Sequence, residues 1–411
     1  MGCCDAPNLM PLDDAIALLH QQLEAITEQE TTALDVALDR ILAQDIKAPI
    51  DVPGYDNSAM DGYALRFGDM ATHREFERVG KAFAGVAFDG RVGKGQCVRI
   101  MTGAPLPAGA DTVVMQEDVQ TQGNKITLLH PAGVKLGQHI RKQGADILTG
   151  RTILTKGKRL GPTDIGLLAS LGLNSIPLIR RLKVAILSTG SELKLPGQGL
   201  EAGQIYDSNR YVLRAMLERL NVEILDLGIV PDIPSALEDA FTIAAEQTDL
   251  IFSSGGVSVG EADYTREILE RMGDITFWKI AIKPGKPLAF GKLGKAYFFG
   301  LPGNPVSATL TFHQVALPAL QLLAGEKTIE PVRLHASVKT KLRKRPGRTD
   351  FQRAYMSATP SGLEVSADSD QSSGVLSSYT SANCYIKLDQ FACDQDKGER
   401  VEVIPFDRWV C

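Results

Sequence analysis

Cysteine and histidine are scarce in this sequence, and neither is arranged as a metal site or a disulfide framework would require. The 411-residue chain has six cysteines, at positions 3, 4, 97, 384, 393 and 411, and no Cys-x-x-Cys pair. This spacing supports neither a zinc ribbon nor a disulfide scaffold. The six histidines show no metal-ligand spacing either. Free thiols of this kind are typical of the reducing cytosol, so we expect a cytoplasmic protein.

The sequence also lacks a strong charge of one sign and a long uninterrupted apolar run. The net charge is −5 and the pI is near 5.8, so the chain offers nucleic acid no global basic surface. The longest apolar-rich segment, Val306–Leu323, contains His313, Gln314 and Pro318. It therefore predicts a buried helix and not a membrane span. We expect neither a nucleic-acid partner nor a membrane partner.

No Walker A sequence is present, and the composition is that of an ordinary soluble protein, with 44% hydrophobic and 23% charged residues. The length suggests about two or three domains. Helical spacing at 11–26 and again at 32–45 gives way after Asp51 to short β-like runs with many Gly and Pro residues. We predict four modules: a split helical or mixed domain at 9–50 and 147–180, an inserted β domain at 51–146, an α/β domain at 181–328 and a C-terminal β domain at 329–411.

The α/β section alternates apolar strands with helices. Strands are predicted at 184–187, 222–227 and 250–252, and helices at 209–220 and 235–246. Such alternation is typical of a doubly wound, mostly parallel sheet. In this fold class, ligands bind outside the carboxyl ends of the strands.

Three of the predicted strands open into loops of small residues, at Ser188–Glu192, Ser253–Asp263 and Gly300–Pro305. Glycine lets the backbone approach a ligand closely, and the N–H groups at a helix start attract phosphate. Each loop alone is compatible with a tight βα turn, but three on one sheet edge predict a phosphorylated or polyanionic ligand. The candidate binding residues are Thr189, Gly190, Ser254, Gly255, Gly256, Ser258, Gly260, Pro302, Gly303 and Asn304.

Charged side chains accompany these loops. Three lysines flank a Pro-Gly turn among apolar residues, which are Lys279, Lys283 and Lys286. Lysine is suited to bind phosphate or another oxyanion, although a solvated surface turn is the alternative. Three carboxylates lie just past predicted strands: Glu192, Asp232 and Asp263. Carboxylates in this position suit Mg²⁺ bound beside phosphate. Their plainer interpretations are a helix N-cap for Asp232, a first helical turn for Glu192 and a surface position for Asp263.

The inserted β section has two dense polar loops of its own, Asp56–Tyr63 and Met101–Asp111. They could close over a ligand, with Asp61 as a carboxylate and Thr102 as a hydroxyl donor. Structural turns explain these loops equally well on physical grounds.

Six segments, in this order along the chain, closely resemble the MoeA family of molybdopterin molybdenumtransferases. They are Asp56–Tyr63, Met101–Pro105, Gly203–Asn209, Ser253–Tyr264, Lys283–Pro287 and Gly300–Ser307. The resemblance runs from about residue 9 to the C-terminus. As a set the segments are specific to the family, whereas the Ser-Gly-Gly-Val-Ser-Val-Gly loop also resembles that of related molybdopterin adenylyltransferases.

The resemblance implies a reaction. Family members take adenylylated molybdopterin and molybdate, cleave the pyrophosphate link with the help of Mg²⁺, release AMP and leave molybdenum on the dithiolene. They work as homodimers, whose cleft is lined by the α/β domain of one chain and the β domain of the other. On this basis the split domain serves dimerisation and the α/β domain binds molybdopterin. Further candidate partners are the molybdopterin adenylyltransferase and molybdoenzyme-maturation proteins.

The resemblance also implies roles for particular residues. The catalytic set it implies is Asp61, Thr102, Asp263, Lys279 and Lys283. Lys286 joins the loop residues in substrate binding, and the implied Mg²⁺ ligands are Glu192, Asp232, Asp263 and Asp146. Two positions depart from the family pattern, because Ser191 stands where an Asp often occurs and the segment 141–146 is less charged than expected.

Two other classes of function remain open at this point. The chain could be a molybdopterin adenylyltransferase, or a nonenzymatic pterin-binding scaffold. The β segments around Asp61 and Thr102 are surplus to adenylyl transfer, and the intact carboxylates favour catalysis over a scaffold. The sequence therefore favours molybdenum insertion.

Overall fold

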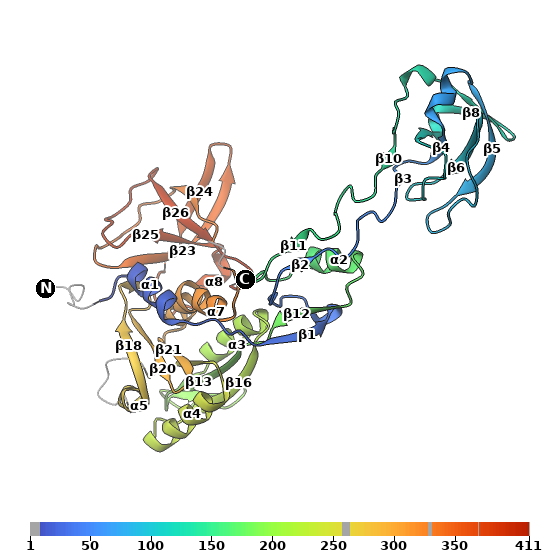
Figure 1. Ribbon diagram of the computed structural model, residues 1–411. Coiled ribbons are helices and arrows are strands. Elements are labelled where there is room, and N and C mark those ends of the chain that lie inside the picture. The colour runs from blue at the N-terminus through green and yellow to red at the C-terminus, as the bar shows by residue number, and fades with distance from the viewer. Residues whose placement is uncertain (1–8, 257–263, 328–330, 369, 411) are drawn as a thin grey trace. The chain divides into compact units, whose positions relative to one another are not determined.

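The computed structural model describes residues 9–256, 264–327, 331–368 and 370–410 (Figure 1). The chain forms two compact units. Unit 1 comprises the chain up to residue 43, residues 157–161 and residues 175 onward, and unit 2 comprises residues 44–156 and 162–174. Each unit is described by itself. The division into four modules stays a prediction.

A six-stranded mixed sheet is the centre of unit 1. Its strands, in spatial order, are β16 (Glu223–Val230), β13 (Lys183–Thr189), β17 (Leu250–Ser254), β21 (Ala296–Leu301), β20 (Pro287–Leu293) and β18 (Gly273–Lys279). The first four strands run parallel to one another. At the β18 edge, β20 runs antiparallel to β21, and β18 runs antiparallel to β20. The predicted doubly wound, mostly parallel sheet is therefore confirmed.

Helices cover both faces of this sheet, because its strands are apolar on both sides. Along β13, Val184 and Ile186 belong to one core, and Ala185 and Leu187 belong to the other, as the two-residue period of a strand requires. The first core packs against α1 (Leu12–Gln22), α3 (Asn209–Arg219), α6 (Pro305–Thr311) and α7 (Leu317–Leu323). The second core packs against α4 (Pro234–Gln247) and α5 (Tyr264–Met272).

The long apolar helix that follows β21 is part of the first core. It is continuous over Pro305–Leu323, with a π-helical turn at Phe312–Ala316 between α6 and α7. It is long and apolar enough to cross a membrane, but 78% of its most apolar window is buried inside the protein. The sequence-based prediction of a buried core helix is confirmed.

The C-terminal section of unit 1 is a second six-stranded sheet. Its strands, in spatial order, are β19 (Ile282–Lys283), β23 (Thr349–Thr359), β24 (Gly362–Ala367), β22 (Leu334–Val338), β26 (Arg400–Pro405) and β25 (Cys384–Leu388), and a short helix α8 (Ser378–Ser381) precedes β25. Strand β19 belongs to the α/β section by sequence, but it pairs with β23 of the C-terminal section. This pairing places Lys283 opposite Asp350. The loop around Lys283 is thus anchored in the C-terminal sheet. Unit 1 also contains two small sheets, β1 (Gln29–Ala33) with β12 (Ser175–Ile179) and β14 (Leu193–Lys194) with β15 (Ile205–Tyr206).

Unit 2 is built on a third six-stranded sheet with a core on each face. Its strands, in spatial order, are β7 (Thr112–Met115), β4 (Gly62–Leu65), β6 (Gln96–Ile100), β5 (Glu75–Ala82), β9 (Lys125–Leu128) and β8 (Val119–Gln122). Two strand pairs and one helix complete unit 2, which are β3 (Asn57–Ser58) with β10 (Ile140–Arg141), β2 (Ile46–Lys47) with β11 (Thr152–Leu154), and α2 (Pro162–Ser170).

The prediction of a second helix over residues 32–45 is wrong. The segment begins as β1, which pairs antiparallel with β12, and continues through a 3₁₀ turn at Leu34–Val36. Asp39 then takes a φ of 61°, which an α-helix does not accommodate. The strand partner lies about 145 residues away in sequence, so the apolar spacing alone did not reveal it.

Candidate functional site

The order of the parallel strands creates a natural binding crevice in unit 1. The first parallel strand, β13, lies between the second, β16, and the third, β17. The connections that follow β13 and β17 therefore lead to helices on opposite faces of the sheet. In open α/β sheets, ligands bind at this switch point, beyond the carboxyl ends of the two strands. Those ends are Thr189 of β13 and Ser254 of β17.

Two glycines bring the loops after β13 and β17 into close contact. Gly255 and Gly256 have φ values of 90° and 67°, which favour glycine. A Cβ on Gly255 would lie 2.5 Å from the carbonyl oxygen of Thr189, and a Cβ on Gly256 would lie 2.4 Å from Oγ1 of Thr265. Since only glycine fits at both positions, the two loops form one wall of the crevice. Gly190 follows Thr189 with a φ of 148°.

Two buried hydroxyl groups in this crevice have no hydrogen-bond partner among the residues that the structure describes. They are Oγ1 of Thr189 and Oγ of Ser253. Buried polar groups in proteins are nearly always paired, so unpaired hydroxyls at a switch point indicate a place for a polar ligand or a water. The sequence predicted Thr189 as a binding residue but not Ser253, although Ser253 opens one of the predicted loops of small residues.

Asn209 joins the loop after β17 to the loop after β21. Its Nδ2 donates to Oγ of Ser254 at 2.8 Å and to the carbonyl oxygen of Gly303 at 2.7 Å. Asn209 was not among the predicted site residues, although it ends one of the segments that carry the family resemblance. The buried carboxylate of Asp207, which was also missed, accepts from Oγ of Ser188 and from Nε of Arg210.

The loop Pro302-Gly303-Asn304 leads into α6, with Asn304 at the N-cap and no side-chain capping bond. One of the free N–H groups of this helix start is already used, because the N–H of Val306 donates to the carbonyl oxygen of Ser373 at 3.1 Å. The loop after β21 is therefore covered in part by a loop of the C-terminal sheet. This contact positions residues 370–373 beside the crevice.

The carboxylates Glu192 and Asp232 lie near each other. Oδ2 of Asp232 accepts from the N–H of Ser191 at 3.2 Å. Burial raises the pKa of Asp232, the Ser191 N–H lowers it, and the charge of Glu192 raises it further. Two carboxylates so placed suit one cation, and Mg²⁺ needs only one or two of them beside ligand oxygens and water. Within the described ranges, no group of three or more His, Cys, Asp or Glu side chains has metal-binding geometry.

The plainer interpretations of these two carboxylates are wrong. The N-cap of α4 is Ile233, and no side chain caps that helix, so Asp232 is not a helix cap. Glu192 lies in a turn that leads into β14, so it is not in a first helical turn. Both side chains remain candidates for cation binding.

The three predicted lysines lie at the turn between β18 and β20. Lys279 lies opposite Pro287 in the β18–β20 pair, and the N–H of Ile280 donates to the carbonyl oxygen of Lys286. The backbone segments that carry Lys279 and Lys286 thus lie side by side. Lys283 instead forms an ion pair, with its Nζ 3.0 Å from Oδ2 of the buried Asp350.

The turn between these lysines packs on α6. Gly285 has a φ of 107°, and a Cβ there would lie 2.4 Å from Cγ2 of Thr311. Flanking apolar residues predicted partial burial, and Lys279 and Lys286 are half-buried, whereas Lys283 is exposed. The turn is therefore a packed element beside α6.

Asp61 and Thr102 meet in unit 2. Oδ1 of Asp61 accepts from both the N–H and Oγ1 of Thr102, each at 2.7 Å. These two hydrogen bonds hold the pKa of Asp61 below its usual range. Asp61 is therefore an ionised acceptor at neutral pH. Asp146 is exposed, and the structure shows no contact that would join it to this pair among the residues it describes. The predicted residues Ser258, Gly260 and Asp263 lie outside the described residues.

Arg353 is a further candidate that the sequence did not reveal. It is fully buried in β23, and its Nη2 donates to the carbonyl oxygens of Asp370 and Ser372. Its Nε and Nη1 have no hydrogen-bond partner within the described part of the chain. A buried guanidinium with free N–H groups is suited to bind an oxyanion. Sequence reasoning missed it because an arginine in a strand is more often exposed.

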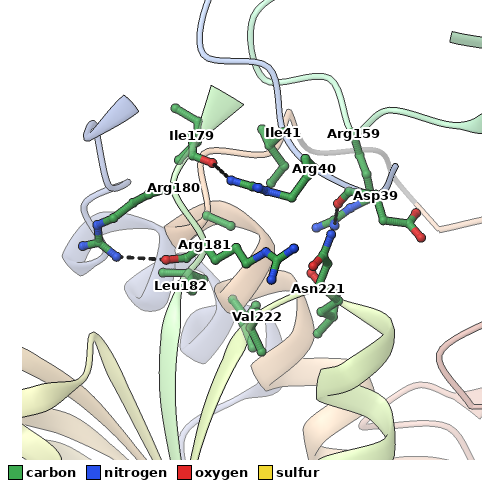
Figure 2. A pocket seen from close by; sticks show the side chains of 13 residues that line it. Asp39, Arg40, Ile41, Arg159, Ile179, Arg180, Arg181, Leu182, Asn221 and Val222 are labelled. Carbon is green, nitrogen blue, oxygen red and sulfur yellow. Dashed lines mark hydrogen bonds between the residues drawn. The ribbon is translucent and has the colours of Figure 1, made fainter. Parts of the chain in front are cut away.

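A small pocket elsewhere in unit 1 is not a substrate site. Figure 2 shows Arg40, Arg159 and Arg181 around it, with Nη2 of Arg40 donating to the carbonyl oxygen of Ile179. Its volume is about 20 Å³, room for about one water, which suits the unpaired Nε of Arg181. A pterin does not fit there.

Three family models match the chain in order along its length. They describe the MoeA N-terminal region (domain I and II) at residues 10–172, a probable molybdopterin binding domain at 185–322 and the MoeA C-terminal region (domain IV) at 335–406. The chain belongs to the MoeA family. The resemblance inferred from six sequence segments, which runs from about residue 9 to the C-terminus, is thus confirmed.

Relatives of this MoeA-family chain carry one functional name. The molybdopterin molybdenumtransferase of Haemophilus influenzae is 44% identical over 97% of this chain and 99% of its own length. That of Staphylococcus aureus is 32% identical over 97% of this chain and 96% of its own length. Among solved structures, two molybdopterin biosynthesis MoeA proteins of Pyrococcus horikoshii match with TM-scores of 0.81 and 0.84 at 32% and 30% identity, and cover 98% and 97% of this chain and 100% of their own.

Proposed function

We propose that this MoeA-family protein inserts molybdenum from molybdate into adenylylated molybdopterin, releases AMP and thereby forms molybdenum cofactor. The observation that carries the proposal is the switch-point crevice. Beside its glycine loops, the buried hydroxyls of Thr189 and Ser253 have no partner among the described residues. Relatives matched over their whole length are named for this transfer. The protein acts in the cytoplasm.

The residues of unit 1 divide between two tasks. Thr189, Ser253 and the loop amides bind the polar and phosphate groups of the pterin substrate. Lys279, Lys283, Lys286 and Arg353 supply positive charge for molybdate and for the charge that develops as the pyrophosphate link breaks. Asn209 is a positioning residue, because it fixes the loops after β17 and β21 relative to each other.

Glu192 and Asp232 would hold a Mg²⁺ ion, and the raised pKa of Asp232 fits a carboxylate pair that a cation would stabilise. When bound, this ion supplies charge neutralisation to the phosphate oxygens. Titration with Mn²⁺, followed by electron paramagnetic resonance, tests the site without reference to activity. Asp232→Asn should weaken Mn²⁺ binding, and unchanged binding would refute the assignment.

The ionised Asp61 with its partner Thr102 is the contribution of unit 2 to the reaction. We propose a homodimer in which unit 2 of one chain completes the crevice of the other. Asp61→Asn and Thr189→Val should each slow the reaction, and mixing the two proteins should then restore part of the activity, since a mixed dimer contains one intact site. No recovery in a mixture proved by mass spectrometry to contain mixed dimers would contradict this arrangement. The molybdopterin adenylyltransferase and molybdoenzyme-maturation proteins remain proposed partners.

One assay separates insertion from the alternatives. The protein is incubated with adenylylated molybdopterin, molybdate and Mg²⁺, and AMP and active cofactor are measured together. Molybdate-dependent AMP release supports insertion, ATP consumption supports an adenylyltransferase, and binding without turnover supports a scaffold. The alternatives are not favoured, because the relatives that share the whole chain carry the transferase name.

A further inference from the structure

A cationic pocket lies at the edge of the C-terminal sheet in unit 1. Its volume is about 420 Å³, and its lining residues, which we call the arginine pocket, are Lys283, Arg343, Lys344, Arg345, Pro346, Arg348 and Asp394. Five of the seven carry a positive charge and one a negative charge. Apart from Lys283, none of them has a role in the reaction proposed above.

The charge of this pocket is only partly neutralised by the protein itself. Lys283 pairs with Asp350, and Oδ1 of Asp394 accepts from the backbone N–H of Lys344 at 2.8 Å. Oδ2 of Asp394 lies 3.8 Å from Nζ of Lys341. Throughout the part of the chain that the structure describes, the three guanidinium groups have no ion pair or hydrogen bond; they belong to Arg343, Arg345 and Arg348.

Lys344 organises the loop that carries these arginines. Its side chain is buried, and its Nζ donates to the carbonyl oxygens of Arg345 and Arg348 at 2.9 and 2.8 Å. Burial lowers the pKa of Lys344, the charge of Asp350 raises it, and the charges of Lys283 and Arg348 lower it. The loop is thus held in shape from within at the expense of repulsion between like charges. A bound anion would relieve that repulsion.

We propose that the arginine pocket binds a small anion that carries two or more phosphate groups. Guanidinium groups recognise phosphate oxygens in pairs, and three unpaired ones around one pocket match more than one phosphate. The volume lies at the lower end of the range for small-molecule sites, roughly 300–1,000 Å³. The ligand is an inorganic polyphosphate or the polyphosphate part of a nucleotide. This inference goes beyond the proposed function and does not depend on it.

The test uses the full-length protein and inorganic pyrophosphate as the probe, with binding measured by isothermal titration calorimetry. The double variant Arg343→Gln/Arg345→Gln should weaken pyrophosphate binding by about tenfold or more, because each charged hydrogen bond lost contributes substantially to affinity. The variant Arg343→Lys/Arg345→Lys keeps the charges but loses the paired geometry of the guanidinium groups. Its affinity for pyrophosphate should therefore lie between those of the unmodified protein and the glutamine variant. The matched control is Lys339→Gln, since Lys339 is an exposed cation of the same sheet outside the pocket.

Two further measurements identify the source of the ligand and test whether the variants fold. Tighter binding of ADP than of pyrophosphate assigns the pocket to nucleotides, and equal binding assigns it to inorganic polyphosphate. Circular dichroism should show unchanged unfolding of the arginine variants, because Arg343 and Arg345 are exposed. The inference is overturned if the glutamine variant binds pyrophosphate as tightly as the unmodified protein, or if inorganic phosphate binds as tightly as pyrophosphate.

Discussion

Gly256 offers the sharpest test of the crevice, because both its backbone angle and its surroundings require glycine. Its φ is 67°, and a Cβ there would lie 2.4 Å from Oγ1 of Thr265 and 2.8 Å from Oγ1 of Thr189. The left-handed conformation costs a non-glycine residue about 1–2 kcal/mol, and overpacking typically costs about 1–3 kcal/mol. Gly256→Ala should therefore lower the free energy of unfolding by roughly 2–5 kcal/mol.

The same substitution should also lower activity, since the added methyl group displaces the unpaired hydroxyl of Thr189. A displacement of about 1 Å can cost on the order of a hundredfold in rate. Denaturant unfolding and AMP release are measured on the same preparation. The matched control is Gly199→Ala, because a Cβ at Gly199 meets no atom within 4 Å. Equal stability and activity in Gly256→Ala and Gly199→Ala would refute the described contact of the two loops.

Three further predictions concern other parts of the chain. Thr102→Val removes one of the two donors to Asp61, so the pKa of Asp61 should rise, as a ¹³C carboxyl titration measures. Glu326→Gln leaves the buried Arg159 without its paired carboxylate and should lower the free energy of unfolding by about 3–5 kcal/mol. Iodoacetamide at pH 8 should label Cys393 but not the buried thiols of β6 and β25, because burial raises the pKa of each of those to about 12; peptide mass spectrometry reads the labels.

Each of these predictions has a matched control. Thr72→Val removes a hydroxyl of unit 2 whose partners are Asp69 and His73, so it should leave the Asp61 titration unchanged. Glu218→Gln breaks an exposed pair with Arg214 and should change the unfolding free energy by at most about 0.5 kcal/mol. Labelling in urea should reach the buried thiols as well. An unchanged pKa of Asp61 after Thr102→Val would contradict the first prediction. A loss of unfolding free energy below about 1 kcal/mol for Glu326→Gln would contradict the second. Labelling of the β6 thiol in the folded protein would contradict the third.

The α/β sheet could be predicted from the sequence because its signal is local. Strand β13 is apolar on both faces, and the loops that follow β13 and β17 carry the glycines that a close approach requires. The family followed from short segments whose order is preserved. These features depend on residues a few positions apart, which a single sequence displays directly.

Features that depend on distant contacts were missed or mistaken. The segment 32–45 has helical spacing, but pairing between β1 and β12 overrides it. Asn209 and Arg353 are buried by elements far along the chain, so nothing in their neighbourhood predicted unpaired or bridging polar groups. The ion pair of Lys283 with Asp350 likewise arises from a strand pairing with a distant part of the chain, which the sequence did not reveal.

The measurement that tests the central claim most directly is AMP release from adenylylated molybdopterin by the purified protein, with and without molybdate. If the switch-point crevice carries out molybdenum insertion, AMP should appear only with molybdate, in proportion to active cofactor. Thr189→Val should slow that release, whereas the half-buried control Thr276→Val, whose hydroxyl bonds Gln22, should not. Molybdate-independent turnover, or full activity of Thr189→Val, would contradict the claim.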